Sequence, residues 1–466
     1  MIAPKKEVPR QLPVWVRSML MVVALAAVAA VIAWLFVRVV PANSRAVALR
    51  TILVGVIANV SCALVGTYLV LRRMSLLGDA ISHAGLPGIA LAVIFSGSVQ
   101  GWPILAGAML VGMLTAVAAQ GLQHFGGVSE DSSLGVVYTS LFALGVIMLQ
   151  IWNPHGHVDV DCVLYGAIEN AGASPPVRWL GLLWPPAVLK LLPVLGIVLA
   201  MIVVAWKELQ LVAFDPALAR AMGLPATAIH LLLMGVVAMV TVSSFESVGS
   251  ILVVPMLVAP AATARLLVDR LSTTLLVAAL AAAIAAALGY ISAFAWKTNA
   301  AGMMAAVIGG ELALAVLFSP RYGLASRWLR NLYLAVQIAA EDIVARFYRA
   351  EERGTALPSA DGANNWLVSM LAQLRVRRKG WLTTQDGHPQ LTSRGRQHAQ
   401  SIVRAHRLWE SYLATHFELP ADHLHAPAER MEHFLDAELQ QQLADELAGK
   451  ALDPHGSPIP PSIEDR

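Results

Sequence analysis

The chain has 466 residues, of which 57% are hydrophobic and only 14% charged, with a mean hydropathy of +0.64 and a net charge of +3. Soluble globular proteins carry about 25% charged residues, so this composition excludes an ordinary soluble enzyme and indicates a membrane protein. The net charge is too small to indicate nucleic-acid binding by itself. Two cysteines, far apart in the chain, exclude a disulfide framework and argue against a cysteine-based metal site.

Charged residues are concentrated toward the C-terminus. Of the 33 basic and 30 acidic residues, 35 lie from Arg321 onward, and eight of the 13 histidines follow Gly380. The chain therefore divides into a long apolar region and a polar tail of about 145 residues, enough for a small domain. We predict an all-α polytopic membrane protein followed by a mostly α, winged-helix-like cytoplasmic domain.

Apolar stretches that can cross a bilayer recur over the first 320 residues. A hydrocarbon core of about 30 Å needs roughly 20 apolar residues per helix, and the first stretch lacks a cleavage pattern, so we expect a retained helix. We predict about ten transmembrane helices. They are Met19–Val40, Thr51–Leu71, Asp79–Ser98, Trp102–His124, Leu134–Trp152, Ala187–Trp206, Ala228–Phe245, Val248–Leu266, Thr273–Ala293 and Ala300–Phe318.

The distribution of basic residues predicts the orientation of these helices. Lys5, Lys6, Arg10 and Arg17 place the N-terminus in the cytoplasm. Counting spans from there, most later basic clusters also fall inside, although the arginines of the first outer loop oppose the rule. Both chain ends, and with them the tail, are therefore predicted to be cytoplasmic, in a bacterial inner membrane.

Asp79 and His83 form the most informative polar pair in the apolar region. Ionisable residues within a span cost about 2.5–3.5 kcal/mol each, so each one is a functional hypothesis. Four residues apart, the two side chains share one helical face and offer half a site for Mn²⁺, Zn²⁺ or Fe²⁺. The alternative is an Asp–His hydrogen bond that joins two helices. Glu246 and Glu311, near helix ends or inside apolar runs, are further candidates for a transport path.

The segment Phe214–Pro225 is predicted to form a short helix at the membrane surface. Asp215 can cap it, Pro216 suits its first position and Gly223 suits its end. The alternative is an ordinary connecting loop. No Gly-x-x-x-x-Gly-Lys-Ser/Thr motif occurs in the chain. If the chain resembles an ABC permease, as described next, this implies ATP hydrolysis on a separate subunit and no enzymatic activity in this one.

These motifs resemble those of ABC permeases that import manganese, zinc and iron. The resemblance covers about residues 50–320 and implies that Asp79 and His83 contact the permeating metal. It also implies that Phe214, Asp215, Pro216, Arg220 and Gly223 belong to a coupling helix that contacts the ATPase. The matching segments are Leu71–Ser75, Gly78–Ala84, Ser133–Tyr138, Leu141–Gly145, Lys207–Pro216, Gly223–Pro225, Val248–Val254 and Pro260–Ala264.

The tail begins with two predicted helices. The first contains Glu341–Arg353 and ends at Gly354, and the second spans Asn364–Leu374. Two short extended segments around Asp386-Gly387 then predict a hairpin, as in the wing of a winged helix.

A dense set of metal-ligating side chains follows the hairpin. His406 and Glu410 lie four residues apart, and Glu429, Glu432 and His433 have spacings that one helical face can present. His425 lies just before them. Because thiolates are missing, the donors suit a hard or borderline ion, with Mn²⁺ favoured. The alternative is a solvated charged helix with incidental histidines.

The tail resembles the diphtheria-toxin-repressor family of metal-dependent regulators, in its manganese-sensing branch. The match runs through Leu391–Gly395, His406–Glu410, His425, Glu429–His433 and Asp453–Pro460. It implies that the metal ligands are His406, Glu410, His425, Glu429, Glu432 and His433, with Asp342 as an N-terminal ligand. Ala345 occupies the position of a companion glutamate, which departs from a complete two-ion site. The segment Thr355–Gly362 replaces a helix that DNA reading needs, so we do not expect nucleic-acid binding.

We therefore predict a permease subunit of an ABC importer for a divalent transition metal, manganese favoured, with a metal-binding regulatory tail. The predicted domains are an extra N-terminal helix and outer loop at 1–50, a permease core at 51–320 and a metalloregulator-like domain at 321–466. The predicted partners are an ATPase, a periplasmic metal-binding protein and a second permease subunit, identical or not. No cofactor is expected for transport, and the metal is both substrate and regulatory ligand. Two alternatives remain: a tail that only assembles the complex, and a membrane-anchored, metal-responsive transcriptional regulator.

Overall fold

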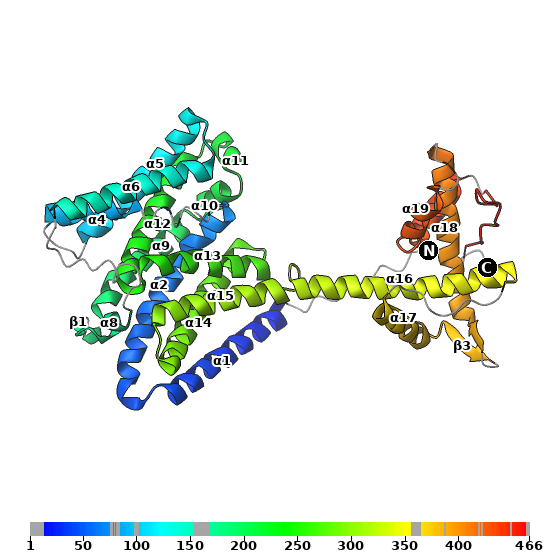
Figure 1. The fold of residues 1–466 in the computed structure, drawn as a ribbon, viewed down its shortest axis with the longest axis horizontal. Coiled ribbons are helices and arrows are strands. Elements are labelled where there is room, and N and C mark those ends of the chain that lie inside the picture. The colour runs from blue at the N-terminus through cyan, green and yellow to red at the C-terminus, as the bar shows by residue number, and fades with distance from the viewer. Residues whose placement is uncertain are drawn as a thin grey trace. The chain divides into compact units, whose positions relative to one another are not determined.

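The computed structural model describes residues 14–74, 78, 80, 84–96, 102–152, 168–179, 181–355, 365–385, 388–417, 420, 423–447 and 450–462. The chain separates into two compact units, Met1–Leu324 and Ala325–Arg466 (Figure 1). Asp79 and His83 lie outside the described residues.

The first unit is a helical bundle with one small hairpin. Its long helices are α1 (Val14–Val39), α2 (Arg45–Leu71), α4 (Leu86–Ser96), α5 (Trp102–Gly126), α6 (Glu130–Trp152), α9 (Pro186–Val204), α12 (Ala226–Val248), α13 (Ser250–Leu267), α14 (Leu271–Trp296) and α15 (Ala300–Phe318). Shorter elements are η1 (Ala42–Ser44), α8 (Ile168–Ala173), the antiparallel strands β1 (Val177–Trp179) and β2 (Leu182–Trp184), α10 (Trp206–Phe214) and α11 (Pro216–Ala221).

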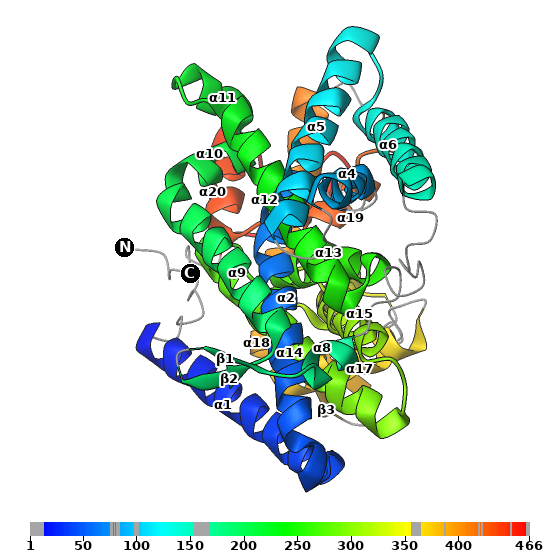
Figure 2. The same ribbon diagram turned by 90° about the vertical axis from the view of Figure 1, so that its left-hand side faces the viewer.

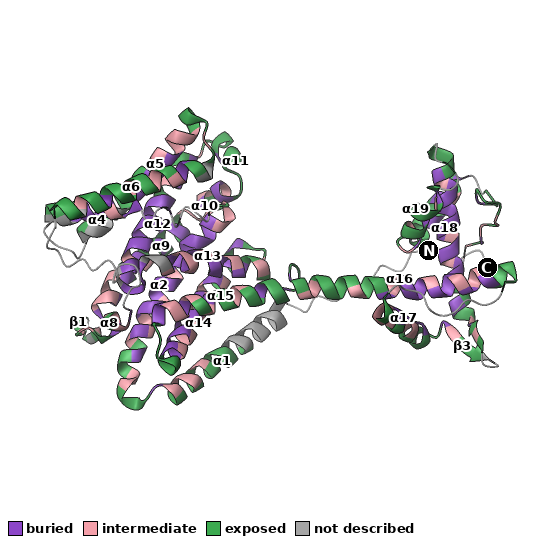
Figure 3. Cartoon of the chain, in the orientation of Figure 1, coloured by how far each residue is buried: buried purple, intermediate pink, exposed green. Residues whose placement is uncertain are grey.

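Helix α2 forms the centre of this bundle (Figure 2). It packs against α8, α9, α12, α13 and α14, and most of its side chains from Val54 to Leu69 are buried (Figure 3). Outer helices such as α5, α6, α9 and α15 instead expose Leu, Ile, Val and Phe side chains. Exposed apolar surface of this extent marks a surface that contacts lipid or protein.

Gly66 permits the close approach of α2 and α13. A Cβ built at Gly66 would collide with the carbonyl of Leu257 on α13, and a backbone atom cannot rotate out of the way. Overpacked cores lose about 1–3 kcal/mol even where side chains can adjust. We therefore expect Gly66→Val to abolish most of the folded protein, measured as the monodisperse peak in size-exclusion chromatography after detergent extraction. Gly196→Val on α9 is the control, because its added Cβ meets nothing within 4 Å; equal peaks for both variants would contradict this account of the packing.

Helices overlap all ten predicted spans, but the count of ten is not confirmed. Within the described part of the chain, five helices are long and apolar enough to cross a membrane: Ala42–Leu71, Pro186–Val204, Ala226–Phe245, Leu271–Trp296 and Ala300–Phe318. In the described part of the predicted span Asp79–Ser98, a turn at Gly85 precedes α4. Pro87 has no backbone N–H to bond into a preceding turn.

In its described residues, the second unit packs five helices and a hairpin. Its elements are α16 (Leu324–Arg353), α17 (Trp366–Lys379), β3 (Leu382–Gln385), β4 (His388–Leu391), α18 (Ser393–His416), α19 (His425–Met431) and α20 (Ala437–Glu446). One core lies between α16, α17, α18 and the hairpin and includes Phe347, Val376 and Val403; a second includes Leu408 and Leu443.

The structure confirms the predicted end of the first tail helix and, within two residues, the predicted start of the second. α16 ends before Gly354, which has a φ of +62°, but it starts at Leu324, well before Glu341. The second helix begins after Asn365, whose side chain accepts a hydrogen bond from the Leu367 N–H, and continues to Lys379. The hairpin is also confirmed, since β3 pairs with β4 from Leu382↔Leu391 to Gln385↔His388. Asp386 and Gly387 lie outside the described residues.

Candidate functional site

Two of the four predicted transport-path residues lie on described helices. Glu311 is on α15, and its Oε2 atom is buried with no hydrogen-bond partner in the described structure. Glu246 lies on α12, two residues before its end, with a side chain outside the described set. A buried carboxylate oxygen without a partner is costly in an apolar helix, and no hydrogen bond in the described structure accounts for this one.

The predicted surface helix is α11, and its ends have the predicted structure. The Asp215 carboxylate accepts hydrogen bonds from the Ala217 and Leu218 N–H groups at 3.0 and 2.9 Å, and Pro216 is the first helical residue. Gly223 follows the helix with a φ of +79°. Val212 of α10, Ala219 of α11 and Ala226 of α12 form a small core, so α11 is fixed to the start of a membrane helix.

This segment exposes three large apolar side chains. Phe214 ends α10, Leu218 lies on α11 and Met222 follows the last residue of α11, and all three are exposed. The sequence analysis did not single out Leu218 and Met222, although their four-residue spacing was an available signal.

In the tail, α18 and α19 bring three predicted ligands together as cluster A (His406, Glu410, His425). His406 Nε2 lies 3.0 Å from Glu410 Oε1 and 3.1 Å from His425 Nδ1, and the last two atoms are 3.0 Å apart. Donors held at about 2.1 Å by an octahedral divalent ion stand about 3.0 Å from one another. The spacing and chemistry of cluster A therefore fit such an ion.

The charge of cluster A follows from its burial and its pairing. Burial raises the pKa of Glu410, but hydrogen bonds from His406 and His425 outweigh burial and lower it to about 2. Burial lowers the pKa of His406, while hydrogen bonds to Glu410 and Glu432 raise it further than burial lowers it. Without an ion, the carboxylate is thus charged at neutral pH and stabilises protonated imidazole beside it.

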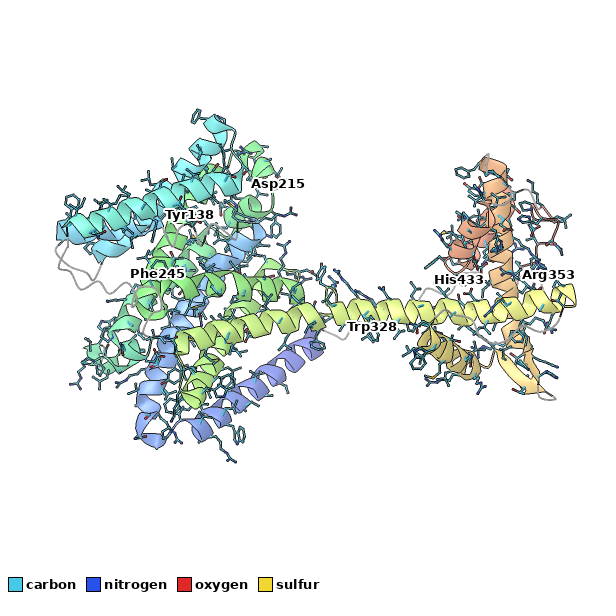
Figure 4. All side chains as sticks on the ribbon, viewed as in Figure 1. Tyr138, Asp215, Phe245, Trp328, Arg353 and His433 are labelled. Carbon is cyan, nitrogen blue, oxygen red and sulfur yellow. The ribbon has the colours of Figure 1, made fainter. Side chains whose placement is uncertain are left out.

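The second group, cluster B (Asp342, Glu432, His433), joins α16 to the residues that follow α19 (Figure 4). His433 Nε2 lies 3.1 Å from Asp342 Oδ1 and 3.7 Å from Glu432 Oε1. The His433 side chain is only 3% exposed. Two carboxylates and one imidazole nitrogen directed at the same point form a donor set for a divalent ion.

Glu341 contacts the ring nitrogen of His433 that does not point into cluster B, and the sequence analysis did not predict this role. Its Oε2 lies 2.8 Å from His433 Nδ1, the arrangement in which a carboxylate holds a ligating histidine in the correct tautomer. Glu341 Oε1 is also 3.7 Å from His398 Nε2, whose ring stacks on Trp381. The available signal was its position three residues before buried Val344, on the apolar face of α16.

Two further observations concern the predicted ligand set. Glu429 is exposed and belongs to neither cluster among the described residues. His455, in the C-terminal turn held by Asp453, has its Nε2 atom 3.8 Å from Glu410 Oε1. His455 is a further histidine near Glu410 among the described residues and was not predicted.

Comparison with known proteins defines the family. Residues 44–319 match the model of the ABC 3 transport family. The chain belongs to the ABC 3 transport family.

The alignments of this ABC 3 protein with its relatives extend over nearly the whole length of each relative. The manganese transport system membrane protein MntD of Bacillus subtilis is 42% identical over 278 residues, 60% of this chain and 94% of its own. A probable metal transport system membrane protein of Chlamydia trachomatis is 28% identical over 85% of this chain and 92% of its own. Among solved structures, PsaBC from Streptococcus pneumoniae in complex with Fab has a TM-score of 0.52 at 28% identity, covering 61% of this chain and 94% of that one.

The tail of the ABC 3 protein matches a second family. Residues 392–461 match the iron dependent repressor metal binding and dimerisation domain. This range holds all of cluster A together with Glu432 and His433, whereas Asp342 comes from α16 outside it. The chain thus combines an ABC 3 permease with a repressor-type metal-binding domain.

The charge state of cluster B predicts that metal binding to the ABC 3 protein's tail depends on pH. Burial lowers the pKa of His433, but hydrogen bonds to Asp342 and Glu341 raise it to about 9. Because a metal ion needs the neutral ring, binding below pH 9 must displace a proton. We expect the Mn²⁺ affinity of cluster B to rise about tenfold per pH unit between pH 6.5 and 8.5. Calorimetry in buffers of different ionisation enthalpy measures the released proton, and a pH-independent affinity would contradict the prediction.

Proposed function

We propose that this chain is the membrane subunit of an ABC importer for a divalent transition metal, with manganese favoured and zinc or iron as alternatives. The observation that carries the proposal is the family match over residues 44–319. The relative MntD, a manganese transport protein by name, supports manganese, as does a donor set of carboxylates and imidazoles without thiolates.

We propose that Asp79, His83, Glu246 and Glu311 line the transport path. The i, i+4 spacing of Asp79 and His83 supports a shared face, and the buried, unpaired Oε2 of Glu311 supports a role beyond folding. Each of these side chains offers oxygen or nitrogen atoms that can replace water around a partly dehydrated cation.

The α11 segment is the proposed contact with a separate ATPase subunit. The exposed apolar side chains of Phe214, Leu218 and Met222 suit an apolar cleft in a partner, and Arg220 adds a charge to the same segment. Because α11 shares a core with α10 and α12, a displacement of α11 would be transmitted to the membrane helix that carries Glu246. Asp215, Pro216 and Gly223 fix the shape of the segment.

The tail is the proposed cytoplasmic sensor of the transported ion. Clusters A and B would hold the regulatory metal through His406, Glu410, His425, Asp342, Glu432 and His433. Bound metal would neutralise the excess of carboxylates there and strengthen the packing of α16 against α18 and α19. Within this proposal, residues 1–50 add a helix and an outer loop, 51–320 form the permease core and 321–466 form the regulatory domain.

Transport also requires partners on both sides of the bacterial inner membrane. We propose a periplasmic metal-binding protein that delivers the ion, and a second permease subunit, either a copy of this chain or a relative.

ATP-driven uptake of radioactive manganese tests the proposal. The chain is reconstituted in proteoliposomes with its ATPase and its metal-binding protein, and Zn²⁺ and Fe²⁺ serve as competitors. We expect accumulation of Mn²⁺ that depends on ATP and on the binding protein, with the stronger competitor identifying the second-best ion. Failure to accumulate any of the three metals would refute the proposed function.

A further inference from the structure

Arg349 of α16 is bonded to the carboxylate that lies between the two metal clusters. Its Nη2 donates a hydrogen bond to Glu432 Oε2 over 3.1 Å. The Glu432 side chain is 1% exposed, whereas that of Arg349 is 24% exposed. The guanidinium therefore reaches from the rim of the domain to a buried anion, and a charge-assisted bond of this kind is among the stronger hydrogen bonds.

Glu432 is the acid that both clusters share. Its Oε2 atom lies 2.5 Å from His406 Nδ1, on the ring that directs Nε2 into cluster A. Its Oε1 atom lies 3.7 Å from His433 Nε2 in cluster B. A cation bound to Glu432 therefore affects the charge of both groups.

The position of Arg349 on α16 places it beside the clusters. It follows Asp342 by seven residues and Ala345 by four, so the three share one helical face. Ala345 is buried and brings no charge to this face. One turn later, the helix supplies a permanent positive charge, because a guanidinium does not deprotonate in a protein.

We propose that Arg349 is a built-in competitor of the metal ion: it neutralises Glu432 in the metal-free tail and thereby sets the metal concentration at which the tail fills. A divalent ion on Glu432 must share or replace the Arg349 bond and bind beside a fixed positive charge. The inference rests on the proposed sensor function of the tail. Arg349 is a residue that determines affinity and is not itself a ligand.

The opposite role for Arg349 makes an opposite prediction. If Arg349 served only to hold Glu432 in a position ready for metal, its removal would weaken metal binding. If it competes with the metal, its removal strengthens binding. The sign of the change in affinity therefore decides between the two roles.

The test is a calorimetric Mn²⁺ titration of the full chain in detergent, with Asp79→Ala and His83→Ala present throughout to remove binding by the membrane unit. We expect Arg349→Gln to bind Mn²⁺ at least about tenfold more tightly. The Mn²⁺ affinity of Arg349→Lys should stay close to that of the protein with arginine at this position. Arg396→Gln is the matched control, since it breaks the exposed 2.7 Å pair between Arg396 and Glu351, and its affinity should not change. Unchanged or weaker binding by Arg349→Gln would overturn the inference.

Thermal unfolding provides a second readout that does not depend on transport. The tail of Arg349→Gln should unfold at a lower temperature without metal, because Glu432 has lost the one partner whose charge is permanent and keeps only its histidine neighbours, and should gain more from added Mn²⁺. An equal Mn²⁺-induced shift in both proteins would also overturn the inference. Absence of Mn²⁺ binding in both proteins would refute the sensor function itself, whereas equal binding in both refutes only the role of Arg349.

Discussion

Replacing Asp79 and His83 together by alanine is expected to reduce ATP-driven manganese uptake to the background of protein-free vesicles. The four-residue spacing of the two residues predicts a shared helical face, and they are the proposed donors for a cation partway through the membrane. Without them, a partly dehydrated divalent ion would find no oxygen or nitrogen donors at this point, and its dehydration free energy would not be offset. Uptake of radioactive manganese by proteoliposomes containing the complete complex measures the effect.

A control must remove the same two chemical groups elsewhere in the membrane unit. His124→Ala with Asp269→Ala does so, because His124 lies in the last turn of α5 and Asp269 forms an exposed pair with Arg321. Exposed pairs contribute about 0–1 kcal/mol, so this variant should fold and transport normally. If the Asp79 and His83 variant retained control-level uptake, the path would have to lie elsewhere and the transport proposal would lose its proposed ligands.

Replacing Glu410 by alanine is expected to remove metal binding at cluster A and to make uptake insensitive to manganese inside the vesicle. The Glu410 carboxylate lies 3.0 Å from both imidazoles and is 2% exposed. Its loss removes the only acid of the cluster A triad and leaves two neighbouring imidazoles, a weaker set for a hard cation. We expect the affinity of this site for Mn²⁺ to fall by about 100-fold or more, a larger effect than the 10–100-fold typical of outer-shell changes.

Glu446→Ala is the matched control for this variant. Glu446 also pairs with a histidine, His416, at 3.3 Å, but both side chains are well exposed. Calorimetric titration of the full chain measures binding, and uptake into vesicles preloaded with graded Mn²⁺ measures regulation. Unchanged Mn²⁺ binding by Glu410→Ala would show that cluster A is not a metal site. Loss of binding with unchanged regulation of uptake would leave the tail as an assembly domain.

The sequence by itself determined the features that depend on local chemistry. Apolar runs of about 20 residues placed helices along the membrane unit because length and hydrophobicity suffice for that prediction. Asp215, Pro216 and Gly223 specified α11, since a cap, a first-turn proline and a terminal glycine act within a few residues. The pair His406 and Glu410 could likewise be read from helical spacing.

The tertiary structure decided what depends on packing between distant segments. Glu341 and Asp342 meet His433 across 91 or more residues of chain because α16 packs beside α18 and α19. Sequence spacing could not separate Glu429, which faces solvent, from Glu432, which faces inward, since only packing selects the face of a short helix. It also could not place Arg349 on Glu432, or the turn at Gly85 within an apolar run. Local pattern fixes which residues are available, and the contacts between helices decide which of them form a site.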